Sequence, residues 1–289
     1  MSNPNKVWFI TGASRGFGVL IARQALARGD AVVATARDPH TVAAALGQHP
    51  QLLALQLDVR DAAQAAAAAG LALQRFGRID VLVNNAGYGL LGAVEEASPE
   101  EVRALFDTNV FGLHTVTRAV LPAMREQRSG HVINISSVGG YAAYAGWGIY
   151  SATKFAVEAL SEALQLELAP LGVKVTVVEP GFFRTDFLDP SSLATTATRI
   201  AAYADTVGAM RTFAAGVNHL QPGDPAKLAT AMLTLADSAQ PPVRLLLGSD
   251  TVQRVRAKNA FVETELAAWL ALATSTDHDD VARKQEPAA

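Results

Sequence analysis

Short apolar runs alternate with longer helical stretches along most of this 289-residue chain, and few folds accommodate such a pattern. The runs predict seven strands, at Val7–Thr11, Ala31–Ala36, Leu52–Asp58, Val81–Asn84, His131–Ser136, Lys174–Glu179 and Arg244–Leu247. Most of the runs are continuously apolar, as in parallel strands that helices cover on both faces. The segments between them are long enough for right-handed helical crossovers. We therefore expect an α/β fold with a doubly wound, seven-stranded parallel sheet flanked by helices.

The remaining segments predict one domain and a tail. Helical patterns cover 19–28, 224–236 and 251–273, and the alanine-rich stretch 62–69 predicts an amphipathic surface helix. A long mixed segment, Phe182–Pro222, separates the last two strands. No linker divides the chain, so we expect a single domain over residues 1–273. Residues 274–289 are polar and predict a flexible tail.

Composition excludes several classes of function. The chain has no cysteine, which rules out thiolate catalysis and Cys-based zinc sites, and its six histidines show no ligand spacing, so we expect no metal. The net charge of −3 does not suggest a nucleic-acid or membrane-surface partner. The sequence shows neither a signal peptide nor an apolar run of about 18 residues, so we expect a cytoplasmic protein.

A glycine-rich loop follows the first predicted strand directly. It reads Thr11-Gly12-Ala13-Ser14-Arg15-Gly16-Phe17-Gly18 and leads into a helical run. Glycines at a strand–helix junction let the backbone approach a pyrophosphate, and the amides and dipole of the helix favour the negative charge. We expect this loop, from Gly12 to Gly18, to bind a dinucleotide through Gly12, Ser14, Arg15, Gly16, Phe17 and Gly18.

The end of the second strand indicates which dinucleotide binds. An NAD site usually has a carboxylate there for the ribose 2′-hydroxyl. This chain has Arg37 instead, and Arg15 lies in the glycine loop. Two guanidiniums suit a 2′-phosphate, so NADP(H) is the favoured cofactor, although both arginines can equally be read as surface charges. Asp38 is either a solvated turn residue or a helix cap.

Two further strand ends contribute polar groups. Asp58, followed by Val59, is expected at the end of the third strand, where its carboxylate either accepts from the adenine amino group or caps the next helix. The run Asn84-Asn85-Ala86-Gly87 follows the fourth strand. We expect its amides to brace the sheet and line the cofactor crevice.

Tyr150 and Lys154 are the candidate chemical centre. They are four residues apart at the start of a predicted helix and so share one helical face. A nearby ammonium lowers the pKa of a phenol towards the range of a general acid/base. Ser136 and Ser137 end the preceding strand and supply hydroxyls nearby.

Together these features resemble the short-chain dehydrogenase/reductase family, whose Rossmann-type fold matches the predicted sheet. The resemblance covers about Lys6 to Thr185. The motifs that carry it are Thr11-Gly12-x-x-x-Gly16-x-Gly18, Asn84-Asn85-Ala86-Gly87, Asn109-Val110-Phe111-Gly112, Ser137, Tyr150-x-x-x-Lys154 and Pro180-Gly181. They occur in the order and at the spacings of the family.

The resemblance implies a role for each catalytic position. Tyr150 would donate a proton to the substrate oxygen in reduction and accept it in oxidation. Lys154 would hold the nicotinamide ribose and tune Tyr150. Ser137, which the family spacing selects over Ser136, would orient the substrate carbonyl. Asn109 would kink its helix and hold a water that connects Lys154 to solvent.

The resemblance also places the nicotinamide beside Pro180 and Gly181, with Thr185 in contact with the cofactor. It suggests homodimers or homotetramers, often formed through the helices that start near Pro99 and Tyr150.

The segment Phe182–Pro222 is the expected substrate lid. It carries Phe182, Phe183, Phe187, Leu188, Tyr203 and Phe213, and Tyr144 and Trp147 add aromatic residues just before Tyr150. No basic cluster accompanies them, so we expect an apolar ketone, aldehyde or secondary alcohol as substrate. Half of these aromatic residues can equally belong to an ordinary core.

Two other functions share parts of this pattern. A non-catalytic dinucleotide-binding regulatory protein would keep the fold, but it would not need Ser137, Tyr150 and Lys154 together. A sugar-nucleotide epimerase or dehydratase usually has a different glycine spacing and a larger C-terminal domain than the sequence after Pro180 allows.

Overall fold

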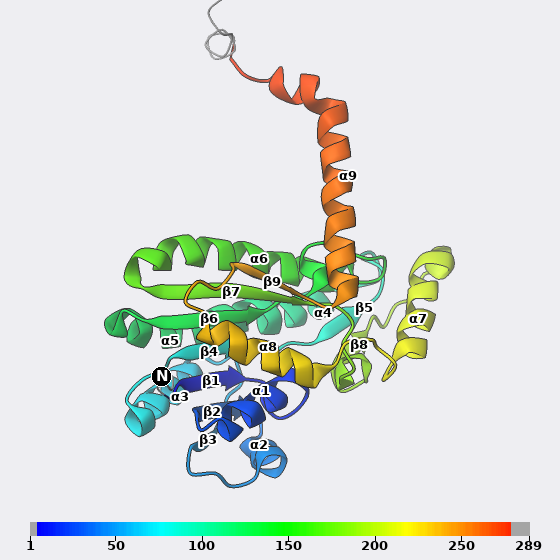
Figure 1. Ribbon diagram of the computed structural model, residues 1–289. Helices are drawn as coiled ribbons and strands as arrows, with labels where there is room; N and C mark the ends of the chain where they lie inside the picture. The colour runs from blue at the N-terminus through cyan, green and yellow to red at the C-terminus, as the bar shows by residue number, and fades with distance from the viewer. Residues whose placement is uncertain (1–4, 279–289) are drawn as a thin grey trace, which may run out of the picture.

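A seven-stranded parallel sheet forms the centre of the molecule (Figure 1). The structure is a computed structural model that describes residues 5–278. The strand order is β3-β2-β1-β4-β6-β7-β9, and the predicted fold class is confirmed. The strands span β1 Val7–Thr11, β2 Ala31–Ala36, β3 Leu52–Gln56, β4 Val81–Asn84, β6 Gly130–Ile135, β7 Val173–Pro180 and β9 Arg244–Leu247.

Helices cover both faces of the sheet (Figure 1). The longer helices are α1 Gly16–Ala27, α2 Pro39–Leu46, α3 Ala62–Phe76, α4 Pro99–Phe106, α5 Leu113–Gln127, α6 Gly148–Leu168, α7 Ala209–Val217, α8 Pro225–Asp237 and α9 Ser249–Thr274. Helices α1, α2 and α8 pack on one face, and α3, α5 and α6 pack on the other. The alanine-rich stretch forms the first half of α3 and buries Ala65, Ala68 and Ala69, as an amphipathic surface helix should.

Alternate residues of one strand serve the two cores. Trp8 and Ile10 of β1 join the cluster under α1 and α8, whereas Phe9 joins the cluster under α3 and α5. All three side chains are fully buried. Because both faces are covered, the strand has no polar side and reads as a continuous apolar run.

The third strand ends earlier than its sequence suggests. Strand β3 stops at Gln56, so Asp58 lies in the following loop rather than in the strand. The cap of α3 is Asp61, whose carboxylate accepts from the amides of Ala63 and Gln64. The suggestion that Asp58 caps this helix is therefore wrong. Asp38, by contrast, is the cap of α2, because it accepts from the His40 amide.

The segment between β7 and β9 has structure of its own. It contains a short strand, β8 (Leu193–Thr195), which pairs in parallel with β5 (Gly89–Leu91) in a second, two-stranded sheet. The turn Asp186–Leu188 precedes β8. The turn Ala201–Tyr203, the π-helical segment Ala204–Gly208 and α7 follow it. The sequence did not predict this small sheet.

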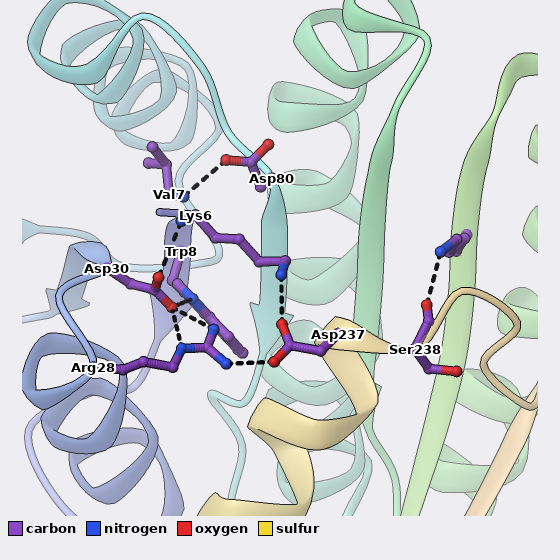
Figure 2. A network of polar contacts seen from close by, with 9 residues as sticks. Lys6, Val7, Trp8, Arg28, Asp30, Asp80, Asp237 and Ser238 are labelled. Carbon is purple, nitrogen blue, oxygen red and sulfur yellow. Dashed lines mark hydrogen bonds and ion pairs between the residues drawn. The ribbon is translucent and has the colours of Figure 1, made fainter. Parts of the chain in front are cut away.

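A polar network fastens the start of β1 to the body (Figure 2). The buried Asp30 carboxylate accepts from Trp8 Nε1 at 2.8 Å and from Arg28 Nε at 3.0 Å. Arg28 and Lys6 both pair with Asp237 at the end of α8. The amino ends of the strands are thereby fixed, and the opposite edge of the sheet remains available for a site.

Helix α9 projects from the body of the molecule (Figure 1). Only its first two turns bury side chains, namely Thr251 and Val255. The predicted tail begins where α9 ends, but residues 279–289 lie outside the described part of the chain. Within residues 5–278, no helix combines the length and the apolar character needed to cross a membrane.

Candidate active site

A long cleft runs along the carboxyl ends of the central strands. Its volume is about 720 Å³, and its walls come from the loops after β1, β2, β3, β4, β6 and β7, together with the start of α6. The segment after β7 closes one side. Open α/β sheets bind ligands at this edge.

Nearly all the predicted site residues line this cleft. They are Gly12, Ser14, Arg15, Gly16, Phe17, Arg37, Asp58, Val59, Asn85, Ala86, Gly87, Ser137, Tyr144, Trp147, Tyr150, Lys154, Pro180, Gly181, Phe182, Phe183, Thr185 and Phe187. Two of the predicted residues, Gly18 and Asn109, lie behind its walls.

The glycine loop has the conformation that its sequence requires. Gly12 and Gly16 have φ values of +64° and +55°, in the left-handed region that favours glycine. Gly18 is needed for space, because a Cβ there would lie 2.4 Å from the Gly12 carbonyl oxygen. The loop thus brings the backbone close to the cleft, and Gly18 acts by packing rather than by lining it.

The amino end of α1 is suited to a phosphate. No side chain caps this end, and its first turn carries no acidic residue. The amides and the helix dipole therefore face the cleft without an internal anion. Together with the glycine cradle, this arrangement fits the diphosphate of a dinucleotide.

Basic residues gather where the adenosine end of a dinucleotide would lie. Arg15 and Arg37 are both exposed and line the cleft. Arg15 also donates to the Ser191 carbonyl oxygen at 2.6 Å. The nearby Asp58 carboxylate accepts from Arg60, and this guanidinium holds the pKa of the Asp58 carboxyl below its ordinary value.

Hydrogen bonds fix the floor of the cleft. The Thr11 hydroxyl accepts from the amides of Asn85 and Ala86, and the Asn85 side chain donates to the carbonyl oxygens of Thr11 and Gly12. The Asn84 side chain donates to Thr117 and Asn134 inside the sheet. Both asparagines therefore brace the loops around the cleft.

Tyr150 and Lys154 meet Ser137 at the far end of the cleft. Both side chains belong to α6 and are 7% exposed. Lys154 Nζ lies 5.7 Å from the centre of the Tyr150 ring and donates to the Ile135 carbonyl oxygen at 2.9 Å. The Ser137 hydroxyl forms a hydrogen bond with Tyr150 and accepts from the Gly139 amide. Ser136, in contrast, has a buried hydroxyl without a partner.

Burial sets the protonation of this pair. It raises the pKa of Tyr150 above its ordinary value, and the hydrogen bond with Ser137 only partly offsets this effect. It lowers the pKa of Lys154 to about 8, and Glu158 opposes that shift. The predicted net lowering of the Tyr150 pKa is therefore wrong, because desolvation of the phenolate outweighs the favourable effect of a nearby ammonium.

Asn109 lies in a π-helical segment, Asp107–Gly112, that joins α4 to α5. Its side-chain amide donates to the carbonyl oxygen of Tyr88 and to Thr153, and its oxygen accepts from the Tyr88 amide. Asn109 therefore interrupts the regular helix, as the resemblance implied. A Cβ at Gly87 would lie 3.0 Å from Asn109 Oδ1 and 3.8 Å from Lys154 Nζ, so Gly87 leaves room for both side chains.

Aromatic rings line the cleft beside Tyr150. Trp147 stacks on Phe187 with 6.4 Å between ring centres, and Tyr150 lies 5.6 Å from each of these two rings. Phe183 packs against Phe17 of the glycine loop. Two other lid aromatics, Tyr203 and Phe213, do not line the cleft.

Several cleft residues carried no sequence signal. Leu193 and Gln221 come from the lid, and Tyr88 follows the fourth strand. The Ile135 carbonyl oxygen that accepts from Lys154 is a backbone atom, so no residue type identifies it. A lid residue enters the site through pairing with a distant segment, as Leu193 does with Gly89, and local patterns do not record such pairing.

One group of potential metal ligands occurs in residues 5–278. Asp186, Asp189 and His219 have ligand atoms within 4.8 Å of one another. Asp189 is already engaged, because Asn218 Nδ2 lies 2.6 Å and His219 Nε2 3.1 Å from its carboxylate. We read this group as a hydrogen-bonded surface cluster of the lid.

Comparisons with known proteins agree with this geometry. Residues 6–195 match the family model described as short chain dehydrogenase. The chain is 39% identical to Oxidoreductase BOA17 of Botryotinia fuckeliana over 86% of this chain and 90% of that protein. A short-chain dehydrogenase from Streptomyces avermitilis is 44% identical and superposes with a TM-score of 0.87 over 95% of this chain and all of its own.

Two further solved structures contain a cofactor. One, a short-chain dehydrogenase/reductase from Burkholderia phymatum in complex with NAD, is 28% identical with a TM-score of 0.79, over 90% of this chain and 95% of its own. The other, the closed form of serine dehydrogenase with NADP+, is 31% identical with a TM-score of 0.69, over 83% of this chain and 94% of its own. By sequence and by fold, the chain is an oxidoreductase that belongs to the short-chain dehydrogenase/reductase family.

Proposed function

We propose that this protein is an NADP(H)-dependent oxidoreductase that interconverts an apolar ketone or aldehyde and the corresponding alcohol. One observation carries the proposal: Ser137, Tyr150 and Lys154 meet at one end of a cleft whose other end is the glycine loop. A dinucleotide along this cleft would have its diphosphate at α1 and its nicotinamide near Pro180 and Gly181.

Tyr150 is the proposed general acid/base. The Tyr150 phenol is protonated at neutral pH, as its ordinary pKa near 10 already requires, and burial raises that pKa further. It can donate this proton to a carbonyl oxygen as negative charge develops on that oxygen. The Ser137 hydroxyl, in contact with Tyr150, offers a second hydrogen bond to the same oxygen. Bound NADPH would supply the hydride that completes the reduction.

Lys154 holds its charge close to the phenol. It is anchored by the Ile135 carbonyl oxygen, and Nζ remains near the Tyr150 ring. An ammonium there stabilises the phenolate that forms when the proton leaves. Lys154 is also placed to hold the ribose hydroxyls of the cofactor. Asn109 is the proposed link from Lys154 to solvent.

The preference for NADP rests on the adenosine end of the cleft. Arg15 and Arg37 supply positive charge there. Asp38 is the carboxylate closest in sequence to the end of β2, and it is engaged as the cap of α2. A 2′-phosphate would therefore find two guanidiniums and no free carboxylate from this loop.

The substrate class rests on the aromatic wall. Tyr144, Trp147, Phe182 and Phe187 surround the space in front of Tyr150. Among the described lining residues, the cationic side chains are Arg15, Arg37, Arg60 and Lys154, which we assign to the cofactor and to catalysis. A neutral, apolar carbonyl compound fits such a wall better than a carboxylate or phosphate.

The test is the loss of NADPH absorbance with a panel of aromatic and aliphatic ketones and aldehydes, for the wild type and for Tyr150→Phe. We expect the variant to lose about 10²–10⁴-fold in turnover and to keep its affinity for NADPH, because only the proton donor is removed. Tyr141→Phe is the matched control, since Tyr141 bonds to Asn259 away from the cleft.

Near-wild-type turnover in Tyr150→Phe would contradict the mechanism. Tight NADPH binding without turnover of any carbonyl compound would instead favour a non-catalytic dinucleotide-binding regulatory protein.

A further inference from the structure

A buried polar cluster lies behind Lys154, on the side away from Tyr150 along α6. Glu158 follows Lys154 by one helical turn, Glu179 comes from β7 and Arg244 comes from β9. Glu158 is 5% exposed and Glu179 is fully buried. Buried charges are costly unless they are paired, so this cluster needs a physical explanation.

Arg244 bridges the two carboxyl groups. Its Nε donates to Glu158 Oε2 at 3.2 Å and lies 3.5 Å from Glu179 Oε1. It also pairs with Glu162, which is half exposed at the edge of the cluster. One guanidinium thus faces two buried carboxyl groups and one surface carboxylate.

Several oxygens of the cluster have no hydrogen-bond partner. They are Glu158 Oε1, both carboxyl oxygens of Glu179 and the Ser136 hydroxyl. Two ionised carboxylates that face each other cannot supply a donor, whereas one proton on the pair does. Burial raises the pKa of both carboxyl groups, but Arg244 opposes the shift at Glu158, whereas the Glu158 charge adds to the shift at Glu179 and brings its pKa to about 8. Glu179 is therefore the member that holds the proton at neutral pH.

The loop that carries Ser137 closes the cluster. A Cβ at Gly140 would lie 2.5 Å from the Ser136 hydroxyl oxygen and 3.0 Å from Glu158 Oε1. Only a glycine therefore allows the backbone to approach this closely and to keep water away. The Glu158 charge is thereby screened less than a surface charge would be.

Lys154 is the catalytic-site neighbour on which this charge acts. Its ammonium is buried, and burial by itself favours the neutral amine. Tyr150 and Glu158, on its own helix, are the titratable groups that face it, and Glu162 on α6, Glu179 on β7 and Arg244 on β9 lie behind Glu158. Of these, Glu158 is the one that acts directly on Lys154 in favour of the charged form.

We propose that Glu158 is a positioning residue of the site, whose carboxylate, held by Arg244 and by a protonated Glu179, keeps Lys154 in its ammonium form. Residues on three elements, α6, β7 and β9, combine to place this one negative charge a helical turn from the lysine. The consequence for catalysis rests on the proposed function, because it acts through Lys154, but the ionisation of Lys154 does not.

The experiment measures that ionisation directly. Protein labelled with ¹³C-lysine is titrated by NMR without cofactor or substrate, and the Lys154 signal is assigned by its loss in Lys154→Arg. In Glu158→Gln we expect the pKa of the Lys154 amine to fall by about one unit. At a given pH, the ratio of ammonium to amine at Lys154 would then be about tenfold lower. Glu162→Gln, one turn further along α6 and also paired with Arg244, is the matched control and should leave it unchanged.

Glu158→Asp keeps the negative charge, so its Lys154 pKa should be close to that of the wild type. If the role of Glu158 were purely structural, Glu158→Asp and Glu158→Gln would change the Lys154 pKa alike. A Lys154 pKa in Glu158→Gln equal to that of the wild type overturns the proposal, whether or not the protein reduces a carbonyl compound. If the Lys154 pKa falls as expected in Glu158→Gln but the turnover of carbonyl compounds does not change, the result would count against the proposed function instead.

Discussion

At the scale of single residues, the site depends on which groups the fold removes from water. Tyr150 and Lys154 have the same low exposure, but burial moves their pKa values in opposite directions, upward for the phenol and downward to about 8 for the amine. Both shifts favour the neutral form. Tyr150 therefore holds the proton that the proposed carbonyl reduction would use, and the charge of Lys154 needs support from its surroundings.

Arg37 provides a test of cofactor choice at this scale. Arg37→Ala removes one of the two guanidiniums at the adenosine end, and we expect NADPH binding to weaken by about 10- to 100-fold, since a charge-assisted contact contributes about 1.5–3 kcal/mol. NADH has no 2′-phosphate, so its affinity should stay within about twofold. Fluorescence titration with both cofactors measures the difference, and equal losses for the two would argue against a 2′-phosphate site.

His131 gives a prediction for stability against pH. Burial, and then the charge of Lys174, lowers the pKa of His131 to about 3, and its Nε2 lies 2.9 Å from the Thr176 hydroxyl. In the unfolded chain a histidine titrates near 6.5, so between about pH 6.5 and 3 the unfolded state binds a proton that the folded state does not. The free energy of unfolding should fall as the pH falls through this window, by up to about 1.4 kcal/mol per pH unit.

Urea unfolding at several pH values tests this effect. His131→Asn should flatten the pH dependence, whereas His114→Asn, at an exposed position on α5, should leave it as in the wild type. If the free energy of unfolding of His131→Asn depends on pH as strongly as that of the wild type, other groups cause the loss of stability at low pH.

At the scale of elements, the proposed lid, residues 182–222, is held by a buried ion pair. The Glu96 carboxylate accepts from the amides of Ala93 and Ile200 at 2.8 Å each and from Arg211 at 2.6 Å. These bonds hold the pKa of Glu96 down to about 2. One carboxylate thus joins the loop after β5 to two separate parts of the lid.

Arg211→Ala should loosen this element. It leaves the Glu96 carboxylate without a charged partner, with two backbone amides and the Thr196 hydroxyl at 3.5 Å as its remaining donors. We therefore expect a lower thermal midpoint and faster proteolytic cleavage within residues 182–222. Arg199→Ala removes an exposed arginine of the same segment and serves as the control. Identical cleavage rates for the two variants would show that Arg211 does not hold the lid.

The elements also differ in how far the sequence predicts them. Strand β1 and its glycine loop are encoded locally, because a doubly covered strand needs an apolar run and Gly12 needs a positive φ. The face shared by Tyr150 and Lys154 follows from helical spacing alone. Strand β8 is only three residues long, is largely exposed and depends on a partner about a hundred residues away, so no local pattern marks it. The direction of the Tyr150 pKa was wrong because burial is a property of the whole fold.

At the scale of the whole molecule, the two ends of the sheet have different tasks. The amino ends of the strands are fastened by Asp30, Asp80 and Asp237, which bond to the start of β1 and to Arg28 (Figure 2). The carboxyl ends carry the glycine loop, the asparagine amides and the proposed catalytic residues. The fold therefore separates stability from chemistry, and variants at the amino ends should alter unfolding more than cofactor binding.

Helix α9 allows a test of how far the folded unit extends. Thr251 and Val255 are its buried residues, whereas Trp269 is 65% exposed and Leu272 is 60% exposed. The described contacts of α9 with the body come from its first half, through β9 and the loop at Tyr141. A chain that stops after Ala260 should therefore keep its free energy of unfolding within about 0.5 kcal/mol and bind NADPH as the full chain does. Val255→Ala in the full chain should cost about 1–2 kcal/mol, because it removes buried methyl groups. Urea unfolding and sedimentation of both variants measure these effects. If the truncated chain loses as much stability as Val255→Ala, or changes its oligomeric state, the outer half of α9 is covered in solution and belongs to the folded unit.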